Sequence, residues 1–163
     1  MLTAGILDGV SLRRKRGVFL NMLNKFEHGV IRKPRAAAGF RGTVRYAPIS
    51  CHMQRELCRK DDVETWIYQQ VELTVGRVPW REVQDINQVG EYKKRCRQPP
   101  GLNELFAPPC PREFHEILQI VDALKYYDQP NYQQIYAVST YSHCSSEVRL
   151  LTIRGERAPR SIF

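Results

Sequence analysis

Five cations lie close together in one segment of the chain: Arg32, Lys33, Arg35, Arg41 and Arg45. Guanidinium groups grip phosphate and carboxylate groups through paired hydrogen bonds. Like charges at this density repel one another unless an anion lies between them. The segment therefore predicts a binding site for an anionic group, which an acidic peptide, a phosphorylated peptide or a nucleic acid could supply.

The positive charge is concentrated in the first part of the chain. Residues 13–60 hold 13 Lys and Arg but only 2 Asp and Glu, whereas the chain of 163 residues holds 25 and 17. A basic face that only keeps the protein soluble is the alternative interpretation. Aromatic residues that could stack on bases are sparse here, limited to Phe19, Phe26, Phe40 and Tyr46, so nucleic acid is the less favoured partner. The cluster RRKR at 13–16 is typical of a solvated loop, a nuclear localisation patch or a nucleic-acid contact.

Cysteine and histidine residues do not form a recognisable catalytic or metal-binding pattern. The five cysteines are irregularly spaced, with no C-x-x-C pair, and the four histidines are scattered. We expect reduced thiols in a cytoplasmic or nuclear protein, and no metal. The N-terminus does not read as a secretory signal, and no stretch is long and apolar enough for a membrane span.

The element that positions these residues is a helix predicted over residues 61–75. Val63, Trp66, Ile67 and Val71 recur at three- and four-residue spacing, which places them on one face, and Gly76 closes the helix. Asp61 and Asp62 begin it, where carboxylates suit the exposed N–H groups.

Further helices are predicted on both sides of this one. They cover 49–57, with Ser50 as a cap, then 83–97, 112–124 and 131–139, with Asn131 as a cap. The segment 25–48 reads as a long ordered loop, and the proline-rich segment 98–111 as a connection. The fold class expected is mainly α, with a domain at 25–142, an uncertain segment at 1–24 and a loosely ordered tail at 143–163.

Six motifs in order resemble the helical C-terminal lobe of a protein kinase. They are GFRGTVRYAP at 39–48, DD at 61–62, VGRVPW at 75–80, QVGEYKKRCR at 88–97, PREFHEIL at 111–118 and LKYYDQPNY at 124–132. The sequence is most similar to the casein kinase I superfamily, and within it to the tau-tubulin kinase branch. The resemblance runs from about Lys25 to Val138, and it implies a helical lobe without the β-rich N-terminal lobe.

The resemblance also implies roles for individual residues. Thr43 matches the threonine that touches the catalytic aspartate, and Arg45 matches an arginine that binds an anion on the protein substrate. Arg95, with Lys93 and Lys94 beside it, matches the second basic partner of that anion. The structural residues expected from the family are Asp62, which holds the backbone of the catalytic loop, and Trp66, Pro79 and Trp80. Gln69 and Gln70 depart from the family, which usually carries apolar residues there.

The machinery for ATP is missing from this sequence. Phosphoryl transfer by kinases uses a Gly-rich loop, a strand lysine, a catalytic-loop Asp and a metal-binding Asp. None of these motifs occurs, although Ile6-Leu7-Asp8-Gly9 resembles the metal motif with its Phe deleted, which makes Asp8 a possible vestige. ATP and Mg are cofactors of the intact family, and we expect none for this chain.

Two functions remain open from the sequence. One is a serine/threonine kinase of the casein kinase I type that is inactive in phosphotransfer as this chain alone. The other is a non-catalytic module that binds acidic or phosphorylated peptides through its basic loop.

Overall fold

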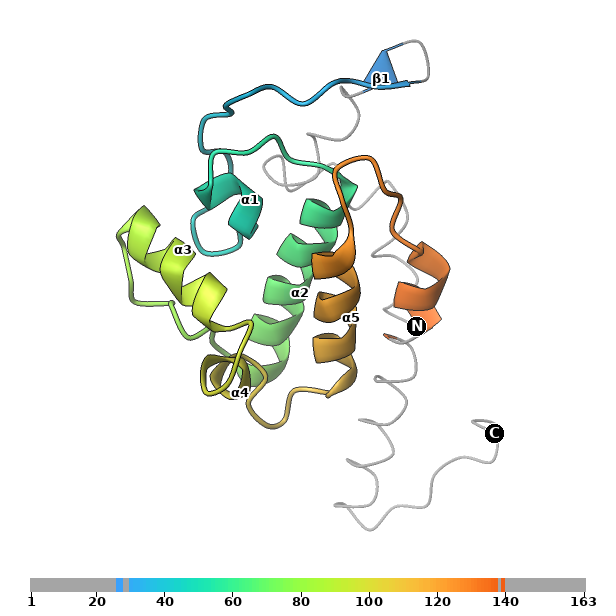
Figure 1. Ribbon diagram of the computed structural model, residues 1–163. Helices are drawn as coiled ribbons and strands as arrows, with labels where there is room; N and C mark the ends of the chain where they lie inside the picture. The colour runs from blue at the N-terminus through green and yellow to red at the C-terminus, as the bar shows by residue number, and fades with distance from the viewer. Residues whose placement is uncertain (1–25, 28–29, 138, 140–163) are drawn as a thin grey trace.

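The structure is a computed structural model that describes residues 26–27, 30–137 and 139. Asp8, the segment 1–24 and the tail 143–163 lie outside the described residues. The described part is mainly helical, as predicted, and is organised around one long helix, α2, at Arg59–Val75 (Figure 1).

Helix α2 begins two residues before the predicted start. Cys58 is its N-cap, and the Cys58 backbone N–H donates to Asp61 Oδ2 at 2.6 Å. Asp61 therefore satisfies an otherwise unpaired donor at the beginning of the helix, which is the effect that its position predicted. Gly76 ends the helix with a φ of 85°, a backbone conformation that glycine adopts without steric cost.

The apolar core lies between α2 and α5, at Glu113–Ala123, which run side by side (Figure 1). Buried side chains of α2 meet buried side chains of α5 in one cluster: Val63, Ile67, Val71, Phe114, Ile117, Leu118 and Val121. Trp66 packs edge-on against Phe114, with ring centroids 6.0 Å apart. The periodicity read from the sequence therefore identified the face that α2 contributes to this interface.

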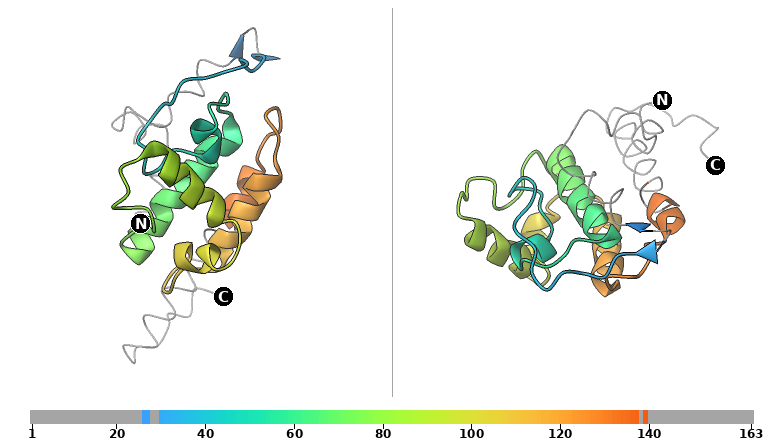
Figure 2. Two further views of the ribbon diagram at one scale, coloured as in Figure 1. Left: turned by 60° about the vertical axis from the view of Figure 1, so that its left-hand side comes forward. Right: turned by 90° about the horizontal axis from the view of Figure 1, so that it is seen from above.

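Shorter helices cover the other side of α2. Helix α1, Ile49–His52, packs against α3, Ile86–Arg95, and α3 packs against α4, Gly101–Leu105 (Figure 2). The side chain of Asp85 caps α3 by accepting from Gln88 N at 2.7 Å. Beyond α5, residues 132–137 are helical, and Asn131 accepts from Gln134 N at 3.1 Å, as its predicted capping role requires.

Several boundaries differ from the prediction. Ser50 lies inside α1, and Pro48 is the N-cap, because proline suits a position whose N–H has no helical partner. Helix α3 begins at Ile86 instead of residue 83, and the proline-rich connection contains the short helix α4. The predicted loop includes one short antiparallel pairing, of β1, Phe26–Glu27, with β2, Val30–Ile31.

No helix within the described residues is both long and apolar enough to cross a membrane.

Candidate functional site

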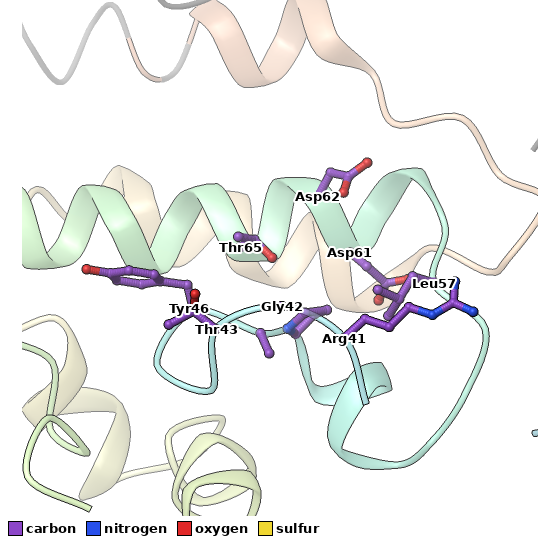
Figure 3. Close-up of a pocket in the computed structure, with 10 residues that line it drawn as sticks. Arg41, Gly42, Thr43, Tyr46, Leu57, Asp61, Asp62 and Thr65 are labelled. Atoms are coloured by element: carbon purple, nitrogen blue, oxygen red, sulfur yellow. The ribbon is translucent and has the colours of Figure 1, made fainter. Parts of the chain in front are cut away.

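The loop formed by residues 41–47 carries two of the predicted site residues, Thr43 and Arg45. Gly42 has a φ of 94°, and the carbonyl of Thr43 accepts from the backbone N–H groups of Tyr46 and Ala47 at 3.0 and 2.9 Å. This turn folds the loop back along α2, with Tyr46 lying beside the helix (Figure 3). Thr43 is exposed, so its hydroxyl is accessible from solvent.

Lys93 fixes the backbone of this loop from the buried side. Its side chain extends from α3, is fully buried, and donates from Nζ to the carbonyls of Val44 at 2.8 Å and Ala47 at 2.6 Å. The ammonium also lies 5.2 Å from the ring centroid of Tyr68 and 5.3 Å from that of Trp80, within cation–π range. Lys93 was expected beside Arg95 as a contact of the substrate's anion, but in the structure its side chain is buried and supports the loop instead.

His52 completes the surroundings of Lys93. Its Nδ1 lies 3.0 Å from the carbonyl of Ile86, which only accepts, so Nδ1 carries the proton and Nε2 accepts from Lys93 Nζ at 3.1 Å. Burial, together with the charge of Lys93, lowers the pKa of His52 to about 4. Burial likewise lowers the pKa of Lys93 to about 7.

Trp80 fixes the other side of the loop. Its indole is buried and donates from Nε1 to the carbonyl of Arg45 at 2.8 Å, while its ring packs edge-on against Tyr68 at 5.0 Å. Pro79 precedes it in the turn that follows α2, and is partly buried. With Trp80 holding one carbonyl and Lys93 holding two, the backbone of residues 44–47 is attached to both α3 and the turn that follows α2.

Arg45 directs its guanidinium to α2. Its Nη1 lies 3.4 Å from Glu72 Oε1, and 39% of its side chain is exposed against 15% for Glu72. Tyr46 donates its hydroxyl to Glu72 Oε2. Burial raises the pKa of Tyr46, and the hydrogen bond to Glu72 raises it further, so the phenol stays protonated. The guanidinium is thus held loosely at the surface.

A small pocket separates the loop from the first turns of α2 (Figure 3). Arg41, Gly42 and Thr43 line it from the loop, and Asp61 and Asp62 line it from the helix. Asp61 is buried, and its Oδ1 lies 3.7 Å from Lys60 Nζ. Thr43 and the two aspartates therefore line the same pocket, while the expected role of Asp62, holding the backbone of a catalytic loop, remains a prediction.

Arg95 is not brought to this pocket by any contact found in the described part of the chain. It is exposed near the end of α3, with its guanidinium 4.8 Å from the ring centroid of Tyr92. Its pairing with Arg45 around one anion remains a prediction. Gln69 and Gln70 are partly buried on α2, so each amide keeps some access to water.

A buried polar network escaped the sequence analysis. Glu64, 1% exposed, accepts at Oε1 from Ile49 N at 3.0 Å, Tyr68 OH at 2.6 Å and Arg97 Nη2 at 2.8 Å. Arg97 also donates from Nε to Asp122 Oδ2 at 2.8 Å. The signal was present, because Glu64 falls on the same helical face as Ile67, Tyr68 and Val71 and so needed a buried cation.

Comparisons with known proteins agree with the motifs. Serine/threonine-protein kinase spe-6 of Caenorhabditis elegans is 38% identical over 112 residues, which cover 67% of this chain and 29% of the relative. Casein kinase 1-like protein HD16 of Oryza sativa is 35% identical over 100 residues, covering 61% of this chain and 14% of the relative. Casein kinase I homolog 2 of Schizosaccharomyces pombe is 31% identical over 93 residues, covering 56% and 21%.

The matched part of this chain is homologous to serine/threonine protein kinases. The relatives include casein kinases I from a plant and a yeast, which supports membership of the kinase family. No protein-family model matches the chain. The chain spans less than a third of the length of each of these three relatives, so the activity of a whole kinase does not transfer to it directly.

Replacing Lys93 by Met should lower the free energy of unfolding by at least about 2 kcal/mol, because it leaves the carbonyls of Val44 and Ala47 without their buried donor. Denaturation by urea measures this. Lys94→Met is the matched control, since Lys94 is exposed and pairs only with Glu91 in the described part of the chain.

The same pair of variants tests the charge state of Lys93. The unfolded chain keeps the Lys93 proton up to about pH 10.5, whereas the folded chain releases it near pH 7, so the unfolded chain binds more protons between these values. This residue should therefore add stability as the pH rises from 7 to 8.5, by up to about 1.4 kcal/mol per pH unit. A slope that is the same in Lys93→Met and the wild type would contradict this assignment.

Proposed function

We propose that this chain forms the peptide-binding part of a serine/threonine kinase helical lobe of the casein kinase I type, in the tau-tubulin kinase branch. The observation that carries the proposal is the loop at residues 41–47. It lies within the segment that resembles the kinases, and it presents Thr43 and Arg45 at the surface while Lys93 and Trp80 hold its backbone. A fixed backbone with accessible side chains suits the binding of an extended peptide.

The charge of the surrounding surface supports an acidic or phosphorylated peptide as the ligand. Lys33, Arg41 and Arg55 are exposed, and Arg45 is partly exposed. Arginine binds carboxylate and phosphate groups through charge-assisted hydrogen bonds, and a surface of one sign accelerates association with a ligand of the opposite sign.

The residues present do not fit ATP and its metal ion. The sequence lacks the Gly-rich loop, strand lysine and catalytic-loop motif of the kinases. Within the residues that the structure describes, no group of three or more His, Cys, Asp or Glu side chains could hold a metal. We therefore assign no step of phosphoryl transfer to this chain, which leaves peptide binding as the function common to both hypotheses from the sequence.

The purified 163-residue chain should not transfer phosphate from ATP to a peptide substrate. Radiolabelled ATP with casein as the acceptor provides the assay, and an intact casein kinase I serves as the positive control. Turnover that stays with the chain through rigorous purification would contradict this part of the proposal.

Arg45→Gln should weaken the binding of a peptide that carries one phosphoserine by about fivefold, the loss of a partly exposed charge pair worth ~1 kcal/mol. Fluorescence anisotropy of a labelled peptide measures the affinity. Arg112→Gln removes the same charge from an exposed position before α5 and should leave the affinity unchanged. Equal losses in both variants would mean that the peptide senses only net charge.

A further inference from the structure

Glu72 lies where a negatively charged ligand of Arg45 would bind. Its Oε1 is 3.4 Å from Arg45 Nη1, within hydrogen-bond distance of the guanidinium. A carboxylate is the same kind of anion as the side chain of an acidic peptide. The cation that the proposed function assigns to the ligand therefore already has a partner inside the protein.

One further contact and the burial of its side chain hold Glu72 in this position. Tyr46, the neighbour of Arg45, donates its hydroxyl to Glu72 Oε2. Glu72 is also only 15% exposed, which limits the orientations open to its side chain. The two carboxylate oxygens are thus divided, one to the loop's tyrosine and one to its arginine.

The position of Glu72 at the end of α2 is by itself unfavourable for a carboxylate. It belongs to the last turn of α2, where Gly76 N donates to the Glu72 carbonyl and where no basic residue lies. The C-terminal end of a helix carries partial negative charge and disfavours anionic side chains. The contacts to Arg45 and Tyr46 offset this, which couples the charge of Glu72 to the loop.

We infer that Glu72 is an internal competitor for Arg45, which lowers the affinity of the loop for anionic groups on a peptide. This inference rests on the proposed function, because it concerns the same arginine. A tethered carboxylate acts at an effective concentration that free ligand must exceed. Because the Arg45–Glu72 distance is 3.4 Å and 39% of the Arg45 side chain is exposed, the ion pair is weak. A ligand can therefore displace the Glu72 carboxylate from Arg45, with a measurable loss of binding affinity.

Titration of one fluorescently labelled phosphoserine peptide against the wild type and four variants tests this inference. The variants are Glu72→Gln, a charge control, Arg45→Gln and the double variant of Glu72 and Arg45. Glu72→Gln should bind the peptide about two- to fivefold more tightly than the wild type, the effect of releasing a partly exposed ion pair. Glutamine keeps an oxygen that accepts from Tyr46, and thermal unfolding of each variant checks that the fold is retained. Glu116→Gln removes the same charge from an exposed position on α5 and should leave the affinity unchanged.

The fourth variant combines Glu72→Gln with Arg45→Gln. Without Arg45 there is nothing to compete for, so Glu72→Gln should give no gain in the Arg45→Gln background, and the two changes should be non-additive. Equal tightening by Glu72→Gln and Glu116→Gln, or a gain that survives in the double variant, would overturn the inference. Should Arg45→Gln weaken binding while Glu72→Gln changes nothing, the inference fails and the proposed function stands. An absence of peptide binding in the wild type and in every variant would overturn both.

Discussion

The buried ammonium of Lys93 is the interaction on which the candidate site depends. It joins α3 to the loop through the carbonyls of Val44 and Ala47, and it faces the rings of Tyr68 and Trp80. A buried cation is costly unless its donors are all engaged, and here three acceptors surround it, including His52 Nε2. The three N–H donors of Lys93 are therefore satisfied in one well-defined arrangement of the loop backbone. That arrangement leaves Thr43 exposed and Arg45 partly exposed.

A second buried charged group, the carboxylate of Glu64, also connects separate elements of the fold. Glu64 on α2 receives Arg97, which follows α3, and Arg97 also binds Asp122 on α5. Because Glu64 also accepts from the first backbone N–H of α1, it joins α1 to α2 and, through Arg97, to the segment after α3 and to α5. Apolar packing between α2 and α5 supplies the main hydrophobic core, while these directional contacts fix how the smaller helices lie against it.

The sequence was sufficient to predict α2 and α5, because strong apolar periodicity and a terminal glycine are local signals. It was insufficient for Lys93. Three cations occupy positions 93–95, and nothing local distinguishes the one that a helix turns into the core from the two it turns into solvent. The short helix α4 was missed because the prolines around it were taken to exclude helix. Glu64 and Glu72 have roles set by residues from other elements, so only the assembled fold identifies them.

The central claim is that the loop at residues 41–47 binds a negatively charged peptide. Nuclear magnetic resonance of the isotopically labelled chain during titration with a phosphoserine peptide tests this most directly. The account predicts that the backbone amide signals that shift most belong to Arg41–Tyr46 and to the first turns of α2 beside the pocket. Shifts confined to α5 and the helix at residues 132–137, or no shifts at millimolar peptide, would contradict it.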